Sequence, residues 1–132
     1  MTLGEMVKYL IILLQSEYIS LCFHERRRWH TLFYQLKKPS NIPGRPDWLG
    51  ELFFNWEGRA PHCEQLEEYL SMLVISGCLH YSSPDFKQYW APKEIVLLWI
   101  KEFTHLEKGE KRYLEDVVFD LAREEFSKAE AA

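Results

Sequence analysis

Side chains that bind metal ions or act as nucleophiles occur in this sequence as neighbouring cysteine and histidine residues. The pairs are Cys22 with His24, His62 with Cys63, and Cys78 with His80. Zinc prefers thiolate sulfur and imidazole nitrogen as ligands, and the N-terminus of a helix can make a cysteine thiol reactive. These residue types therefore indicate a zinc site or a thiol nucleophile as candidate chemistries.

The spacing of these residues differs from that of most structural zinc sites. Such sites usually contain a C-x₂₋₄-C knuckle, and the sequence has none. Cys63 falls on the apolar stripe of a predicted helix, where cysteine behaves as a small hydrophobic residue. No Asp or Asn stands out as the orienting member of a catalytic triad. The motifs GxGxxG, GxxxxGK[ST], HExxH and GxSxG are absent as well. The sequence therefore predicts neither an enzyme nor a cofactor.

Basic and acidic residues are unevenly distributed along the 132-residue chain, whose formal net charge is −4. Residues 1–46 contain seven Lys or Arg and three Glu, a balance of +4, so the remainder carries −8. The candidate binding residues gather in the predicted second helix: Arg26, Arg27, Arg28 and Lys38. Two interpretations remain open. These residues form a surface for phosphates or an acidic partner, or a solvated face that pairs with the acidic half of the same chain.

Hydrophobic periodicity and turn residues predict about five helices and a small antiparallel β-sheet. The predicted helices cover residues 3–17, 21–38, 61–76, 92–103 and 110–129, and the strands cover 51–56 and a hairpin near 78–91. A helix over 47–56 is the alternative to the first strand. Pro61 suits the first position of a helix, and Gly77 suits the position just after its end. The helix at 92–103 is apolar on nearly all sides, which predicts a central position.

This order of elements predicts an α+β, mostly α fold in a single domain, residues 1–132, close to the winged-helix plan. In that plan a hairpin follows the third helix, and the strand before that helix completes the sheet. DNA-binding members place this helix in the major groove and need polar or basic residues on it. Its predicted outward residues are His62, Glu64, Gln65, Glu67, Glu68 and Ser71. Because carboxylates repel phosphate, we do not expect DNA binding through this helix.

Two stretches resemble the small bacterial Panacea-domain proteins, which are antitoxin-like. HERRRWHTLFYQLKK, residues 24–38, is similar to the second helix of that family, and Tyr34 matches a Tyr near the helix end. FFNWEGRAPHCEQLEEYLSMLVISGCL, residues 53–79, resembles the next signature, an aromatic strand, a Gly and Pro, and a helix. The family has Gly and Pro adjacent, whereas two residues separate Gly58 from Pro61 here. The resemblance implies an interaction domain, often paired with a toxin or mobile-element function, with no agreed catalytic residues.

The leading hypothesis is a non-enzymatic regulatory or protein-interaction domain, antitoxin-like or phage-derived. Its partner would be another protein or a second copy of the chain, and the helices at 94–103 and 110–129 are the candidates for a dimer contact. Aromatic residues near the predicted strands form either core or an exposed protein-binding patch. One alternative is a nucleic-acid-binding protein that uses the basic second helix. Another is a small metal- or thiol-dependent protein that uses the Cys/His pairs.

Cysteine usage and hydropathy indicate the compartment. Three cysteines do not make a dense disulfide framework, which favours a reducing environment. The apolar stretch at 9–14 is too short for a secretory signal, and Glu5 lies where such a signal is basic. No segment approaches the roughly 20 apolar residues of a membrane span. We therefore expect a cytoplasmic protein without a membrane partner.

Overall fold

The computed structural model of the chain describes residues 1–17, 19, 21–22, 26–38, 42–81 and 88–131, and it confirms the α+β, mostly α prediction. The α-helices are α1 (Leu3–Ser16), α2 (Arg27–Lys37), α3 (Glu64–Ile75), α4 (Lys93–Glu102), α5 (Lys108–Tyr113) and α6 (Phe119–Ala131). The 3₁₀ helices η2 (Asp47–Glu51) and η3 (Phe103–His105) and the π-helical segment η4 (Leu114–Val118) complete the helical part. The strands are β1 (Leu21–Cys22), β2 (Asn55–Glu57), β3 (Ala60–His62), β4 (His80–Tyr81) and β5 (Gln88–Trp90).

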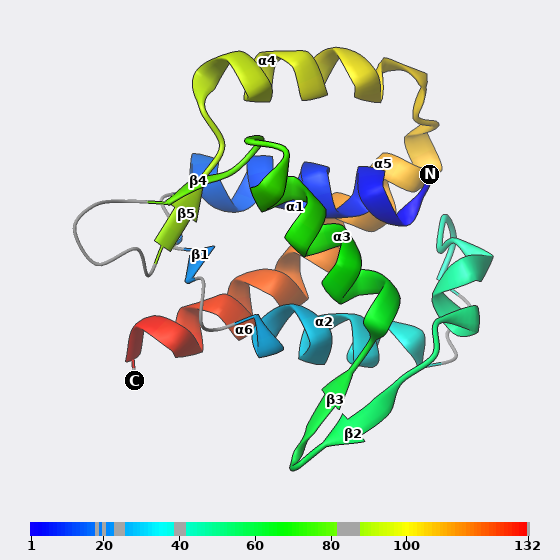
Figure 1. Cartoon of the computed structure of the whole chain (residues 1–132). Coiled ribbons are helices and arrows are strands. Elements are labelled where there is room, and N and C mark those ends of the chain that lie inside the picture. The colour runs from blue at the N-terminus through cyan, green and yellow to red at the C-terminus, as the bar shows by residue number, and fades with distance from the viewer. Residues whose placement is uncertain (18, 20, 23–25, 39–41, 82–87, 132) are drawn as a thin grey trace.

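Helix α1 lies at the centre of the fold, with α4 on one side and α2 and α6 on the other (Figure 1). Its apolar residues Met6, Val7, Leu10, Ile11 and Leu14 are fully buried. Apolar residues at the helical spacing therefore face the core on more than one side of α1. The first predicted helix is confirmed, and it takes the central position.

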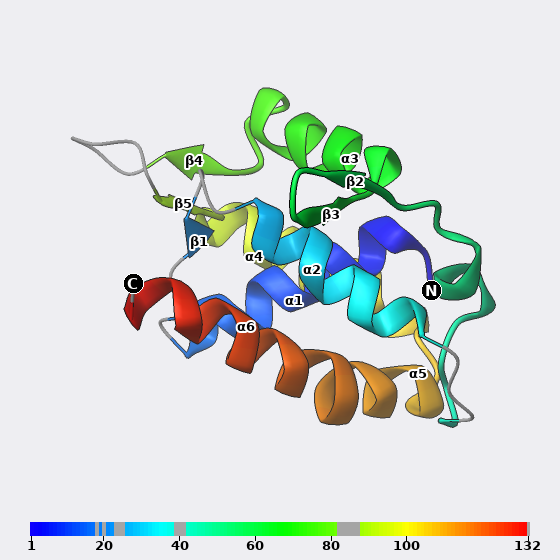
Figure 2. The same cartoon turned by 90° about the horizontal axis from the view of Figure 1, so that it is seen from below.

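The C-terminal helix is longer than predicted and runs through α5, η4 and α6 without a break in the helical backbone. Leu114 and Val118 in the π-helical segment are fully buried. Helix α2 packs along α6, where the Trp29 and Phe126 rings meet edge to face with centroids 4.9 Å apart. Figure 2 shows α2 and α6 side by side.

The strands form two separate antiparallel sheets, one ordered β1-β5-β4 and one made of β2 and β3. The strand predicted near 51–56 is β2, but it pairs with β3, where Trp56 lies opposite Pro61. Gly58 has φ of 64° and allows the tight turn between them. The predicted pairing of this strand with the 78–91 hairpin was therefore wrong. Strand β1 takes that edge, in a segment predicted as the start of the second helix.

Helix α3 begins at Glu64 rather than at Pro61. Pro61 is part of β3, and the following Cys63 keeps an extended backbone (φ −118°, ψ 112°) as the residue that caps the helix. The predicted end is confirmed, because Gly77 adopts the left-handed backbone with φ of 83°. Its N–H donates to the carbonyl oxygen of Val74 at 3.1 Å, which closes the last turn.

Helix α4 is peripheral, so the predicted central position of the 92–103 helix was wrong. Figure 1 shows α4 along one edge of the molecule, over α1. Trp99 is the fully buried residue of α4, whereas Leu97, Leu98 and Ile100 are 52%, 54% and 48% exposed. The apolar composition of α4 therefore does not come from core packing on all sides. Within the described residues, neither α4 nor another helix has the length and apolar composition to cross a membrane.

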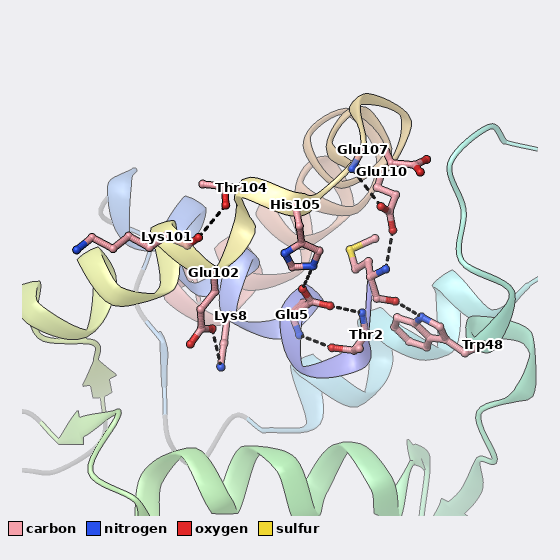
Figure 3. A network of polar contacts seen from close by, with 11 residues as sticks. Thr2, Glu5, Lys8, Trp48, Lys101, Glu102, Thr104, His105, Glu107 and Glu110 are labelled. Atoms are coloured by element: carbon pink, nitrogen blue, oxygen red, sulfur yellow. Dashed lines mark hydrogen bonds and ion pairs between the residues drawn. The ribbon is translucent and has the colours of Figure 1, made fainter.

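Polar contacts hold the start of α1 against η3 and the end of α4 (Figure 3). Thr2 Oγ1 accepts from the N–H of Glu5 at 3.1 Å, and Glu5 Oε1 accepts from the N–H of Thr2 at 2.8 Å. This capping box satisfies donors that the first turn leaves without partners. Glu5 Oε2 also lies 2.6 Å from His105 Nε2, and Lys8 Nζ lies 3.1 Å from Glu102 Oε2.

Two glycines with positive φ differ in what surrounds them. Gly44 has φ of 86°, and a Cβ atom built there would collide with the carbonyl oxygen of Gly109 in α5. Gly58 also has a positive φ, but a Cβ atom there would have no neighbour within 4 Å. A side chain at Gly58 would therefore meet backbone strain alone, whereas a side chain at Gly44 would meet backbone strain and a collision.

We expect Gly44→Ala to lower the free energy of unfolding by clearly more than Gly58→Ala. Each substitution costs about 1 kcal/mol because alanine disfavours the left-handed backbone, and Gly44→Ala must also displace the backbone of α5. Chemical unfolding of the two variants measures the difference. Equal losses would contradict the close approach between Gly44 and Gly109.

Candidate functional site

The predicted pairs His62–Cys63 and Cys78–His80 lie at opposite ends of α3. The helix has 12 residues and therefore measures about 18 Å at 1.5 Å per residue. Cys63 is fully buried, Cys78 is half-buried, and both are free thiols. The structure therefore does not bring these two pairs together.

The third pair lies only partly within the described structure. The backbone of Cys22 belongs to β1, while its side chain and all of His24 lie outside the described residues. His80 is exposed on β4, with its ring edge-on to Trp90 at a centroid distance of 5.2 Å. In the part of the chain that the structure describes, no three or more His, Cys, Asp or Glu side chains are grouped to hold a metal ion.

Two of the predicted basic residues pair with carboxylates from the second half of the chain. Arg26 Nη1 donates to Glu67 Oε1 of α3 at 2.9 Å. Arg28 Nη1 donates to Glu125 Oε1 of α6 at 3.2 Å, and the Glu125 side chain is almost fully buried. These arginines therefore hold α2 to α3 and α6. Arg27 and Lys38 are exposed at the two ends of α2.

His30 was not predicted as a site residue, yet it is the buried centre of a polar network between α2 and α3. Its Nδ1 accepts a hydrogen bond from the backbone N–H of Cys63 at 3.0 Å. Its Nε2 lies 2.9 Å from Glu67 Oε2, and Arg26 donates to the other oxygen of that carboxylate. Because Nδ1 is occupied as an acceptor, the ring proton is on Nε2, and Nε2 donates to Glu67. We call His30, Glu67, Arg26 and Cys63 the His30 network.

The electrostatics of the His30 network favour a neutral imidazole beside an ionised carboxylate. Burial lowers the pKa of His30 below its usual 6.5, although Glu67 favours the protonated ring. Burial raises the pKa of Glu67, but hydrogen bonds from His30 and Arg26 and the charge of Arg26 outweigh it, so that pKa lies below its usual 4.5. Both directions agree with the hydrogen-bond geometry.

The His30 network positions backbone rather than a reacting group. Both ring nitrogens of His30 already have protein partners, so neither is placed to take a proton from a substrate. The His62 ring stacks on the His30 ring with centroids 4.5 Å apart, which fixes the end of β3.

The prediction that Glu67 faces outward was wrong, because its carboxylate lies between α3 and α2. The sequence feature that could have identified His30 is its place beside Trp29 on the apolar side of α2.

A shallow groove runs along α2 beside the β2–β3 hairpin. One hollow of about 590 Å³ is lined by the aromatic residues Tyr34, Phe54 and Trp56 together with Lys37, Lys38 and Arg45. A neighbouring hollow of about 510 Å³ shares Tyr34, Lys38 and Trp56 with the first and adds Arg59 of the hairpin. We call the two hollows together the α2 groove.

A second surface lies on the outer face of α4. Glu94, Leu97, Leu98 and Lys101 are all exposed. They occupy positions i, i+3, i+4 and i+7, which share one face of a helix. We call these four residues the α4 stripe. The sequence named the helix at 94–103 as a candidate dimer contact, but a helix that is apolar on nearly all sides does not reveal which of its faces is exposed.

Comparisons with known proteins return no match among protein-family models, curated proteins or solved structures. The Panacea-domain resemblance therefore stays a prediction from the residues that carry it. The function of this chain must be argued from the geometry and charge of its own surfaces, of which the α2 groove and the α4 stripe are the two described above.

We expect acid to destabilise the protein in two steps that report the His30 network. Between the lowered folded-state pKa of His30 and the unfolded value near 6.5, the unfolded chain binds more protons than the folded one. Stability is therefore full above about pH 6.5 and falls as the pH drops through the folded-state pKa. The lowered pKa of Glu67 adds a second loss below about pH 4.5. Melting temperatures across this range measure both steps.

The variant His30→Gln tests the origin of the first step. Glutamine can donate to Glu67 and accept from the Cys63 N–H, but it does not titrate. We expect the loss that begins below about pH 6.5 to shrink in His30→Gln. The control His80→Gln removes an exposed imidazole outside the network and should keep the loss. An unchanged first step in His30→Gln would contradict the assignment.

Proposed function

We propose that the protein is a non-catalytic, winged-helix-like interaction domain that forms a homodimer through the α4 stripe. The observation that carries the proposal is the order of side chains in the stripe, which is acid, apolar, apolar, base. A second copy running in the opposite direction places a base opposite each acid and a leucine opposite each leucine. The stripe is therefore complementary to itself.

Antiparallel pairing of α4 with α4 of a second copy, about a two-fold axis, determines which residues meet. Glu94 faces Lys101 of the partner subunit, and Leu97 faces Leu98 of the partner subunit. Two-fold symmetry repeats each contact, so two ion pairs flank a central group of four leucines. Glu94 lies in the first turn of α4 and Lys101 in the last. The dipoles of two antiparallel helices also attract each other, in addition to the two ion pairs.

The exposed leucines supply the driving force for this pairing. Leu97 and Leu98 are more than half exposed, and Ile100 is close to half exposed. Single exposed apolar residues are normal on protein surfaces, but large aliphatic side chains close together on one helix are typical of interfaces. Burying them gains about 25 cal/mol for each Å² of apolar surface removed from water.

The charged ends of the α4 stripe are directed to solvent. Glu102, the neighbour of Lys101, is held by Lys8 of α1. Figure 3 shows the Lys101 side chain extending away from the Lys8–Glu102 pair. Within the described residues, neither Glu94 nor Lys101 makes an ion pair. Their exposure supports the proposed pairing across a two-fold axis.

The remaining features support an interaction domain rather than a DNA-binding winged helix. The β4–β5 hairpin follows α3, as in the winged-helix plan, although β1 replaces the predicted third strand. Glu64 and Glu68 are exposed on α3, so this helix presents carboxylates where DNA-binding members present cations. A role in protein contacts agrees with the antitoxin-like resemblance and with the leading hypothesis from the sequence.

We expect the full chain to dimerise in solution and Glu94→Lys to weaken the dimer. The substitution places two lysines together at each end of the stripe, and symmetry doubles the effect. The dimer dissociation constant should rise about tenfold, since each exposed pair contributes up to about 1 kcal/mol. Lys101→Glu should do the same. Sedimentation analysis over a concentration series measures each constant.

The double variant Glu94→Lys/Lys101→Glu restores opposite charges at both ends and should restore most of the affinity. Asp116→Lys makes the same charge change at an exposed position of η4 and serves as the control. A wild-type protein that stays monomeric at about 100 μM would overturn the proposal. A double variant no tighter than the two single variants would overturn the antiparallel pairing.

A further inference from the structure

Helix α2 and the β2–β3 hairpin, which line the α2 groove, lie on the side of α1 away from α4 in Figures 1 and 2. In Figure 1, α4 forms one edge and α2 lies toward the other. A ligand in the groove would therefore leave the α4 stripe uncovered. An inference from the groove is independent of the proposed homodimer.

The floor of the groove is aromatic. The Tyr34 ring lies edge-on to both Phe54 and Trp56, with a centroid distance of 5.4 Å and an interplanar angle of 71° in each case. Phe54 and Trp56 are two residues apart in extended backbone and so share one side of it. Phe54 is half-buried, whereas Trp56 is 59% exposed. The indole is therefore held by neighbours and still offers a flat apolar face to solvent.

Cations line the same groove. Lys38 at the end of α2 and Arg59 at the hairpin turn are exposed and make no ion pair within the described residues. Lys37 Nζ lies 5.8 Å from the centroid of the Phe54 ring. Arg45 donates to the carbonyl oxygen of Lys37 at 3.0 Å and so caps the carboxyl end of α2. Positive charge therefore lies at both ends of the aromatic floor.

Acidic residues near the groove lie away from its hairpin side. Glu125 of α6 lines the second hollow of the groove, where it pairs with Arg28 at 3.2 Å, and Glu124 lines a separate hollow beside α6. Glu57 follows Trp56 in β2 and so points to the opposite face of the strand, where its carboxylate lies 3.6 Å from His62 Nδ1. A polyanion would therefore follow the hairpin side of the groove, over Trp56.

We propose that the α2 groove binds single-stranded nucleic acid, with a base stacked on Trp56 and backbone phosphates near Lys38 and Arg59. Exposed aromatic rings within a positively charged groove are the means by which proteins hold single strands without reading their sequence. A duplex keeps its base faces inside its own stack and can use only the cations. An acidic peptide would also use the cations and leave the indole face without a matching partner.

The proposal changes the residues assigned to nucleic-acid binding. The sequence pointed to Arg26, Arg27, Arg28 and Lys38. The structure places Arg26 on Glu67 and Arg28 on Glu125. The proposed site keeps Lys38, with Arg27 and Arg28 lining the same hollow. It adds Arg59, Tyr34 and Trp56, which come from different elements and were not grouped by the sequence.

Fluorescence anisotropy with the full chain tests the proposal, with labelled single-stranded DNA and single-stranded RNA of mixed sequence as probes. We expect a dissociation constant on the order of 1–100 μM at low salt, weakening as salt rises from about 50 to about 200 mM. Trp56→Ala should weaken binding about tenfold or more, because it removes one stacked base. Lys38→Gln and Arg59→Gln should each weaken binding and reduce its salt dependence. Binding of either strand type supports the site.

Matched controls separate the groove from general surface effects. Phe53→Ala removes an aromatic ring that is 73% exposed but does not line the groove, and it should leave the affinity within about twofold of wild type. Arg112→Gln removes an exposed cation of α5 and should also have little effect. Thermal unfolding of each variant confirms that it is folded before its affinity is compared.

Three results would overturn the proposal. The first is no binding of either strand by the wild-type protein at low salt. The second is an equal loss of affinity in Trp56→Ala and Phe53→Ala. The third is equal or tighter binding of duplex DNA or of poly-glutamate, since charge alone would then account for the groove.

Discussion

His30 donates to the carboxylate of Glu67 and accepts from the backbone N–H of Cys63, and these two hydrogen bonds fix α3 against α2. Cys63 caps α3, but no side-chain capping bond is made at this end of the helix. In a capping box the N–H of the cap residue donates to a side chain three positions on, which here is the apolar Leu66, and His30 of α2 supplies the acceptor instead. Arg26 holds the second oxygen of Glu67, so the half-buried carboxylate has both a neutral and a charged donor. Removing a partner of the buried His30 ring leaves a ring nitrogen unsatisfied and costs about 1–3 kcal/mol.

The positions of both proposed surfaces depend on the His30 network and on the central place of α1. His62 stacks on His30, and β3 leads directly into the cap of α3. The His30 network therefore also positions the β2–β3 hairpin. The hairpin in turn brings Trp56 beside Tyr34 and creates the α2 groove. On the opposite side, α1 fills the core and leaves α4 with an apolar outer face (Figure 1). A dimer through α4 would present two α2 grooves that point away from its two-fold axis.

Periodicity in the sequence predicted the class of the fold and the elements whose pattern is local. Helix α1, the stop at Gly77 and the β4–β5 hairpin segment are examples. Partners that depend on distant segments were not predictable in this way. Pro61 fits a helix start by local rules, yet it pairs with Trp56 in a strand. Helix α4 reads as a core helix because periodicity reports how apolar a helix is and not what covers it. The link between His30 and Glu67 spans 37 residues and leaves no periodic signal.

The tautomer and charge of His30 test the account most directly. Long-range ¹H–¹⁵N NMR correlation of the imidazole rings distinguishes Nδ1–H, Nε2–H and doubly protonated histidine. The account predicts that His30 is neutral and carries its proton on Nε2 at about pH 7, and that it stays neutral below the usual pKa of histidine. A ring protonated on Nδ1, or a charged ring at about pH 7, would contradict the hydrogen bonds of the His30 network. It would also contradict the hairpin position that depends on them.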